Sequence, residues 1–250
     1  LEYPDDCIVD FDMRLIDLFK EMDKKKLTLK MQIRQEYYRV KELLDGKRPS
    51  RMDLFTYMDD EIYRICVSGS HAKENPFQHY LDFLYELDEL SEDEQKLYAG
   101  IGREFIQTIE TTEMQKVYKM PILYSFYNHG DIRLAVTDEE VLESWKEFFD
   151  TGTNWKDFPN VNTYEDYKKV TDKQHLSKAK RMPIRFLKAS GKGFFVEKDG
   201  YALALRDEIG DVVGNMTFGE QMGDVLGYRS LEYYRRRYEK KMNVKLVNIV

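Results

Sequence analysis

Residues 118–205 constrain the fold most, because helix-like and strand-like patterns follow one another there in a definite order. A helix-like segment precedes a short strand at 132–136 and a helix whose start, Thr137-Asp-Glu-Glu140, has the form of a capping box. After a polar loop come a basic helical segment and two strand-like runs joined at Lys198-Asp199-Gly200, a strong hairpin signal. Helix, strand, helix, helix and hairpin is the element order of a winged helix, so we expect a winged-helix-like module with a small β-hairpin.

The rest of the chain carries apolar residues at helical spacing, separated by helix-capping residues. Asp10 and Thr28 are predicted to begin two helices, and Ser91 to cap one long helix with Leu97, Ile101, Phe105 and Ile109 inward. We therefore predict a mainly α protein in which an antiparallel helical bundle or array precedes the winged-helix-like module.

Three regions are predicted along the chain. Residues 1–114 form the helical bundle, 115–215 the winged-helix-like module, and 216–250 a C-terminal helix that packs back. Within them, residues 207–215 read as a loop, and the last helix is expected to run through four residues: Leu226, Leu231, Tyr234 and Tyr238.

Charge is distributed unevenly. Residues 1–114 hold 16 Lys and Arg against 26 Asp and Glu, whereas 115–250 hold 23 against 20. Within 168–206 the count is 11 against 3, a net charge of +8, which would attract a polyanion. The alternative is a lysine-rich surface that only keeps the protein soluble, and composition favours neither.

The basic segment and the hairpin supply the candidate nucleic-acid-binding residues. Lys178, Arg181, Arg185 and Lys188 recur at steps of three and four residues, so a continuous helix would present them on one face, with Ala179, Phe186 and Leu187 inward. Lys180, Lys192 and Lys198 would extend that surface toward the hairpin. Such cations would contact the phosphates of DNA. Phosphate contacts position a protein on the duplex but do not recognise its base sequence.

Pro183 interrupts this pattern. Proline lacks a backbone donor and disfavours helix at the preceding residue, Met182. We therefore expect two short helices that meet at Pro183, and if they diverge the four cations no longer share a face.

Several stretches resemble the C-terminal accessory region of bacterial DEAD/DEAH-type superfamily-two helicases of the restriction-subunit-like kind. They are DFDMRLIDLF at 10–19, RPSRMDLFTYMDDEIY at 48–63, YKMPILYSFYN at 118–128 and EFF at 147–149. The resemblance covers the first 150 residues and implies the accessory part of an ATP-driven nucleic-acid motor without its motor domains. The chain contains neither a Walker A loop nor a DEAD or DExH box, so no ATPase residue of that family corresponds to a position here.

Other chemistry finds little support in the sequence. Ser190-Gly-Lys-Gly193 lacks the spacing of a phosphate-binding loop and is predicted to be a helix-ending turn. Asp59-Asp60-Glu61 fits the first turn of a helix better than a metal site, and Glu197 with Asp199 is too few ligands for a metal nuclease. No catalytic residue, metal ligand or cofactor-binding residue is predicted, and no cofactor is expected for this chain.

The functional hypothesis is a non-catalytic C-terminal domain of an ATP-dependent DNA helicase, a hydrolase as a full-length protein, that binds duplex or forked DNA. Its expected partners are DNA and the upstream motor domains. The alternative is a regulatory scaffold that docks on the motor or on a partner subunit.

The chain begins at Leu1 without a signal-like segment, has no apolar run long enough to span a membrane, and has two isolated cysteines. We accordingly expect a cytoplasmic piece of a longer protein that does not associate with membranes.

Overall fold

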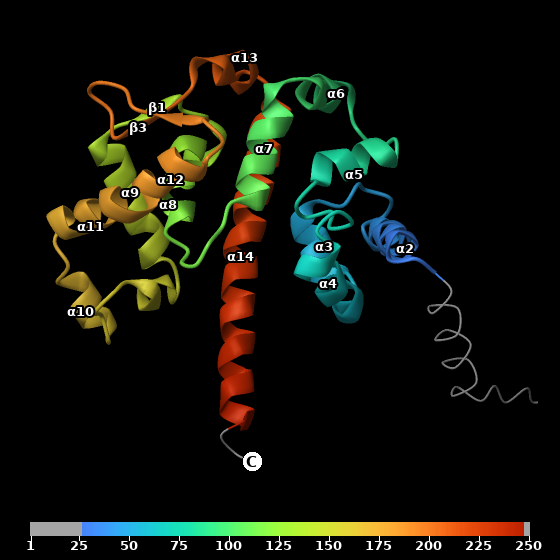
Figure 1. Cartoon of the computed structure of the whole chain (residues 1–250), viewed down its shortest axis with the longest axis horizontal. Helices are drawn as coiled ribbons and strands as arrows, with labels where there is room; N and C mark the ends of the chain where they lie inside the picture. Colours follow the sequence, from blue (N-terminus) through green and yellow to red (C-terminus); the bar gives the residue numbers. More distant parts are fainter. Residues whose placement is uncertain (1–26, 248–250) are drawn as a thin grey trace, which may run out of the picture. The chain divides into compact units, whose positions relative to one another are not determined.

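A computed structural model describes residues 27–247 of the chain, with side chains described as far as residue 239, and it confirms a mainly helical protein with one small antiparallel sheet (Figure 1). The helix predicted after Asp10 lies outside the described residues. The chain divides into two compact units, one comprising residues up to Pro49 together with Asp53–Asn75, and the other Ser50–Met52 with Pro76–Val250. These units divide at other residues than the three regions predicted from the sequence.

The described part of the first unit, from residue 27 on, is helical. Thr28 caps α2, as predicted, and its side chain accepts a hydrogen bond from the Met31 amide. Asp59 caps α4 by accepting from the amides of Glu61 and Ile62, so the acidic cluster there stabilises a helix start. The helices are α2 (Leu29–Leu43), α3 (Arg51–Tyr57, whose first two residues belong to the second unit), α4 (Asp60–Cys66) and the 3₁₀ turn η1 (Gly69–His71).

The second unit begins with α5 (Tyr80–Glu86), α6 (Glu92–Ala99) and α7 (Ile101–Thr111). Ser91 and Glu94 form the predicted capping box at the start of α6. The prediction of one long helix after Ser91 is wrong, because Gly100 adopts an extended conformation with φ −117° and ψ −168°. The break brings Gly102 so close to Leu97 that a Cβ at residue 102 would lie 2.0 Å from the leucine Cδ1.

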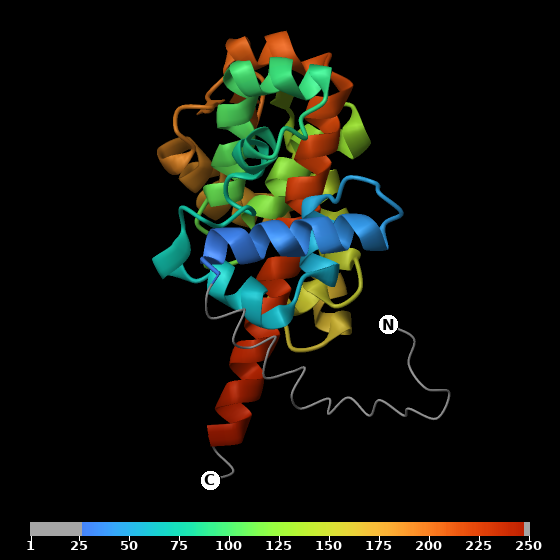
Figure 2. The same ribbon diagram turned by 90° about the vertical axis from the view of Figure 1, so that its right-hand side faces the viewer.

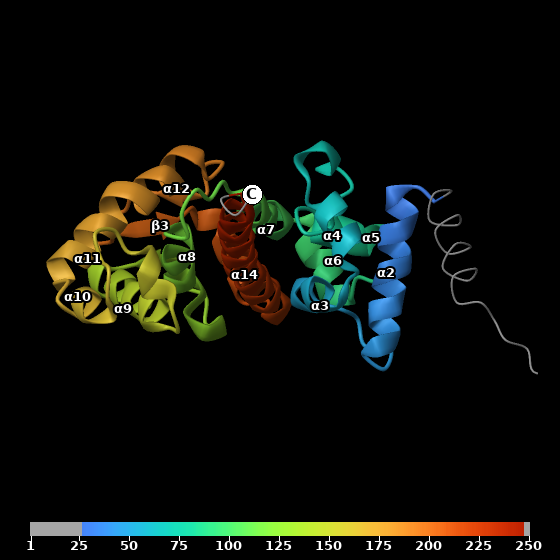
Figure 3. The same ribbon diagram turned by 90° about the horizontal axis from the view of Figure 1, so that it is seen from below.

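Helix α14 (Met216–Val247) is the long element of the second unit, and α6, α7 and α8 (Lys119–Tyr127) pack along it (Figures 1 and 3). Its buried side chains include Phe218, Met222, Val225 and Leu226. The predicted last helix is confirmed over this span, and within it Leu231 and Tyr238 are 44% and 57% exposed. None of the helices within residues 27–247 combines the length and the apolar character needed to cross a bilayer.

The C-terminal half of the second unit supports a three-stranded sheet in the order β1-β3-β2, with both pairs antiparallel. Ala135 pairs with Ala204, and Val196 pairs with Ala204 from the other side. The elements follow α8 in the order η2 (Asn128–Gly130), β1 (Ala135–Val136), α9 (Asp138–Asp150), η3 (Asn154–Asp157), α10 (Tyr164–Lys168), α11 (Asp172–Ala179), η4 (Lys180–Ile184), α12 (Arg185–Ser190), β2 (Phe195–Val196) and β3 (Leu203–Leu205).

Local sequence signals determine the ends of these elements. Thr137 and Glu140 form the predicted capping box of α9. The hairpin between β2 and β3 turns where the Tyr201 amide donates to the Lys198 carbonyl, with Gly200 at φ +82°. Glycine adopts this left-handed conformation without the steric cost of a side chain, which explains the turn.

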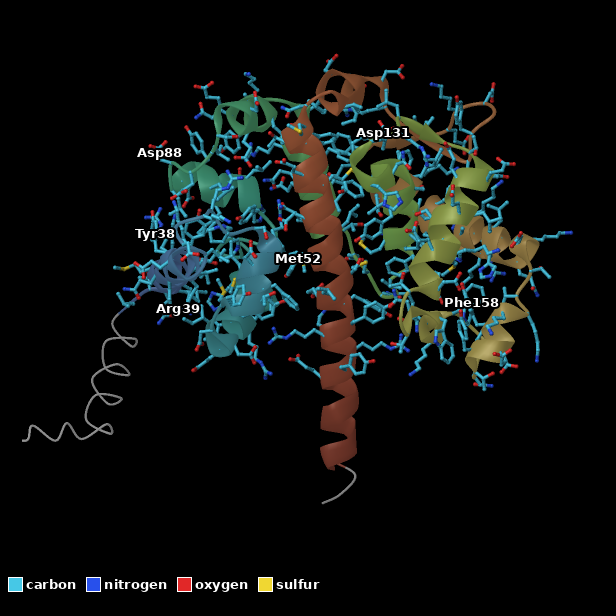
Figure 4. The ribbon with its side chains drawn as sticks, turned by 180° about the vertical axis from the view of Figure 1, so that it is seen from behind. Tyr38, Arg39, Met52, Asp88, Asp131 and Phe158 are labelled. Atoms are coloured by element: carbon cyan, nitrogen blue, oxygen red, sulfur yellow. The ribbon has the colours of Figure 1, made fainter. Side chains whose placement is uncertain are left out.

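Aromatic side chains fill the core between α9, α10 and α11. Phe158, labelled in Figure 4, packs its ring against Phe149, Tyr167 and His175. His175 is 2% exposed, and burial lowers its pKa, so it is a neutral core residue. The segment between α9 and α11, which contains η3 and α10, therefore packs on an aromatic core.

The helix at Pro183 differs from the prediction. Lys180–Ile184 form a π-helical turn, and the helical path continues from α11 through this turn into α12. A π turn changes the hydrogen-bond spacing from four residues to five and accommodates a proline that has no donor. It also shifts the helical face: Ala179 and Leu187 are buried as predicted, but Phe186 is 41% exposed.

Residues 207–215, predicted as a loop, contain the short helices η5 (Asp207–Ile209) and α13 (Gly210–Val213). Ile209 is fully buried and explains why this segment is held in place. Helices α6 and α13 lie at the N-terminal end of α14 (Figures 1 and 2).

A buried polar network joins several helices of the second unit. Arg51, which is fully buried, donates to Glu110 Oε1 at 3.0 Å from Nε and 2.6 Å from Nη2. Its Nη1 lies 2.8 Å from both Gln221 Oε1 and Asp224 Oδ2, and its guanidinium carbon lies 4.4 Å from the centre of the Tyr80 ring. Asp224 also accepts the Arg51 amide, so this carboxylate stabilises the start of α3.

Candidate nucleic-acid interface

The seven predicted basic residues all lie on the segment from α11 to the hairpin. Lys178 is on α11, Lys180 and Arg181 are in the π turn, Arg185 and Lys188 are on α12, Lys192 follows α12, and Lys198 is in the hairpin turn. They are exposed except for Lys178 and Lys188, which are half-buried. The structure thus places each of them within reach of solvent.

Two of the seven cations are held by carboxylates. The Lys180 ammonium lies 2.6 Å from Asp138 Oδ2 at the start of α9. Lys188 is paired with Glu197, which follows β2. Lys188 lowers the pKa of the Glu197 carboxyl through a hydrogen bond and its charge, so this acid stays ionised as a counterion. These two lysines are the weaker candidates for phosphate contact.

The other five have no carboxylate within ion-pair distance among the described residues. Three lie beside aromatic rings: Lys178 Nζ is 5.1 Å from the Tyr118 ring centre, Arg185 Cζ is 5.1 Å from that of Phe186, and Lys198 Nζ is 5.5 Å from that of Tyr201. Arg181 and Lys192 complete the set. Because these five cations have no carboxylate partner among the described residues, the segment has a positive electrostatic potential.

Burial lowers the pKa of Lys178, and the neighbouring charges of Arg181 and Lys116 lower it further. Arg181 and Lys116 are therefore each close enough to Lys178 to repel its charge, although Lys116 is more than 60 residues earlier in the chain. An anion placed among them would relieve that repulsion.

A pocket of about 470 Å³ lies beside this group, and we call it the basic cleft. It is formed by the end of α7, the loop before α8, the π turn and α12. Its lining residues include three lysines and four apolar or aromatic side chains: Lys116, Lys119, Lys192, Tyr118, Met182, Pro183 and Phe186. Among the pocket's lining residues Glu113 is the one acid, so the cleft has a net positive charge.

Lys119 has the most unusual environment in the cleft. Its side chain is on the first residue of α8, the residue is 8% exposed, and Nζ donates to Thr112 Oγ1 at 2.9 Å. Burial lowers the pKa of Lys119, the nearby Arg229 lowers it further, and Glu113 opposes both effects. Lys116 and Lys119 were not among the sequence-predicted site residues, because their proximity to the basic segment depends on tertiary packing.

The predicted helix-ending role of Ser190-Gly-Lys-Gly193 is confirmed. The Gly191 amide donates to the Leu187 carbonyl at 2.8 Å and ends α12. A Cβ at residue 191 would lie 2.3 Å from the Phe195 ring, so only glycine fits. Lys192 has φ +50°, a left-handed conformation that is uncommon for lysine.

No group of three or more His, Cys, Asp or Glu side chains within the described part of the chain could hold a metal ion. Glu197, considered above as a metal ligand, is the partner of Lys188. The arrangement that remains is a positively charged segment beside an amphipathic cleft, which can bind an anion that also has an apolar face. Comparison of the chain with protein-family models, curated proteins and solved structures finds no significant match.

Proposed function

We propose that this protein binds DNA through a winged-helix-like module formed by residues 115–215. The order α8, β1, α9, α11–α12, β2, β3 and the strand order β1-β3-β2 support the proposal. In a winged helix the third helix approaches a DNA groove and the hairpin contacts phosphates or an adjacent groove. Here the third helix corresponds to α11 through α12, and the hairpin turn carries Lys198.

The observation that carries the proposal is the set of five cations without a carboxylate counterion in the described structure: Lys178, Arg181, Arg185, Lys192 and Lys198. Lysine and arginine near phosphates release condensed counterions, and this release dominates nonspecific DNA affinity. Because of the π turn, the cations do not lie on one helical face. They therefore cannot form a regular row of side chains along the base edges in a groove. We therefore propose contact with the DNA backbone rather than sequence readout.

The wider context is also a proposal. The resemblance to the accessory region of superfamily-two helicases suggests that the module positions DNA for upstream motor domains in an ATP-dependent helicase. Docking of the module on a motor or partner subunit is the alternative.

The proposal is tested by fluorescence anisotropy with a labelled duplex. Replacing Arg181, Arg185 and Lys198 together by glutamine should weaken binding at 0.1 M salt by about five hundredfold, because each removed phosphate contact lowers the salt exponent by about 0.9. The matched control replaces Lys146, Lys168 and Lys169 by glutamine, since each of these is already paired with an acid. Control and wild-type affinities should agree within a few-fold.

Equal affinity of the Arg181, Arg185 and Lys198 variant and the wild type would overturn the proposal. Absence of DNA binding at low salt, together with tight binding to a separately produced motor fragment, would favour the docking alternative.

A further inference from the structure

The basic cleft contains a buried positive charge without a carboxylate partner. Lys119 has one described hydrogen bond, to a hydroxyl, and no carboxylate of the described residues lies within 4.0 Å of its amine. The neighbouring Arg229, whose charge acts on Lys119, is also buried, at 9% exposure, and pairs with Glu232 at 3.7 Å. Burying an ammonium is costly unless an anion accompanies it. An anionic group of a ligand would supply the missing charge.

The same cleft offers an exposed aromatic surface. Phe186 is turned out of the core by the π turn, and Arg185 lies over its ring. Met182 and Pro183 extend this apolar lining. Single π-helical turns are frequent at functional sites, where they redirect side chains that an α-helix would bury. An exposed ring flanked by cations is the arrangement on which unpaired nucleobases stack.

We infer that the basic cleft takes one unpaired nucleotide of a DNA strand, with its phosphate near Lys119 and Lys116 and its base against Phe186. This inference rests on the DNA binding proposed above. A nucleotide combines the anion and the planar apolar group that the lining requires, and a volume of about 470 Å³ is in the range of small-molecule sites. A paired base inside a duplex cannot reach such a cleft, so the ligand belongs to an overhang or a fork.

The test compares three labelled DNAs that carry the same number of phosphates: a blunt duplex, a duplex with a short overhang, and a duplex whose overhang is abasic. The overhang with bases should bind about 5- to 150-fold more tightly than the abasic one, because stacking one base on an aromatic side chain has an effect of this size. The abasic overhang retains its phosphates, so it separates stacking from charge.

Two variants assign the effect to the cleft. F186A should remove the preference for the overhang with bases and leave the affinity for the blunt duplex within twofold of wild type. Because Lys119 is buried and its replacement could disturb folding, K116Q at the cleft surface tests the phosphate contact, and it should weaken overhang binding more than blunt binding. Y85A, which replaces an exposed aromatic outside the cleft, is the matched control and should keep the preference.

Equal binding of the base-containing and abasic overhangs, with normal binding of the blunt duplex, would overturn the inference and leave the proposed DNA binding intact. The absence of binding to all three DNAs would overturn both. Phe186-dependent binding of free deoxynucleoside monophosphate without any overhang preference would show a site for free nucleotide and would also overturn the inference.

Discussion

Replacement of Arg51 by methionine should destabilise the second unit strongly. The substitution removes the positive charge that balances Glu110, a residue that is 2% exposed, and the donor that Gln221 and Asp224 share. Removing one partner of a buried ion pair costs about 3–5 kcal/mol, because the remaining charge is left uncompensated. With three acceptors losing a donor, we expect a loss of about 4–5 kcal/mol in the free energy of unfolding at neutral pH.

The loss should depend on pH in a defined direction. Burial raises the pKa of Glu110, and the charge and hydrogen bonds of Arg51 oppose this rise. Without Arg51 the folded-state pKa of Glu110 increases further above the value of about 4.3 in the unfolded chain. The folded variant then binds a proton that the unfolded chain does not, so its free energy of unfolding decreases as the pH rises above about 4.3. The deficit relative to wild type should be largest at neutral pH and shrink on acidification.

Urea denaturation followed by tryptophan fluorescence measures this effect selectively, since both tryptophans, Trp145 and Trp155, belong to the second unit. Lys146→Met is the matched control, because Lys146 is 44% exposed in its pair with Asp172 and should cost less than about 1 kcal/mol. A similarly small cost for Arg51→Met, or a deficit that does not change with pH, would refute the reasoning.

Three further predictions concern other parts of the described structure. Gly191→Ala should lower the free energy of unfolding by about 1–3 kcal/mol, since its Cβ would lie 2.5 Å from the Leu187 carbonyl oxygen. Gly214→Ala, with open space around it, should change stability little in the same urea denaturation. Burial lowers the pKa of His175 in the folded protein, so on acidification the unfolded chain takes up a proton at this residue before the folded protein does. The free energy of unfolding should therefore fall as the pH drops below about 6.5. This pH dependence should be weaker in His175→Phe, and an unchanged profile would contradict it. Burial raises the pKa of the Cys66 thiol to about 12, so mass spectrometry of native protein treated with iodoacetamide at pH 8 should find Cys66 unmodified until denaturant is added.

Sequence patterns predicted those features that depend on neighbours a few residues away. Thr28, Ser91 and Thr137 cap their helices as expected, because a cap requires only a side-chain oxygen and an amide three residues on. The hairpin at Gly200 formed for a similar local reason. The mainly helical class followed from the same signals.

Features that depend on distant contacts were not predictable in this way. Gly100 breaks a helix whose apolar spacing continues across it. Proline at residue 183 signalled a disruption, but whether it becomes a break or a π turn depends on the surrounding packing. That turn exposes Phe186.

The candidate site shows the same division. Charge counting located the basic segment, and five of its seven predicted cations have no carboxylate partner within the described chain. The pairing of Lys180 with Asp138 and of Lys188 with Glu197 required the folded structure. So did the approach of Lys116 and Lys119, whose charges lie in a part of the sequence with no excess of positive charge.

The salt dependence of duplex binding tests the central proposal most directly. If the five cations without carboxylate partners each contact a phosphate, the slope of log K against log salt concentration should be about −4.5 for the wild type. Replacement of Arg181, Arg185 and Lys198 by glutamine should bring it to about −1.8, while the control with Lys146, Lys168 and Lys169 replaced should keep the wild-type slope. Identical slopes for the wild type and the first variant would contradict phosphate binding by this segment.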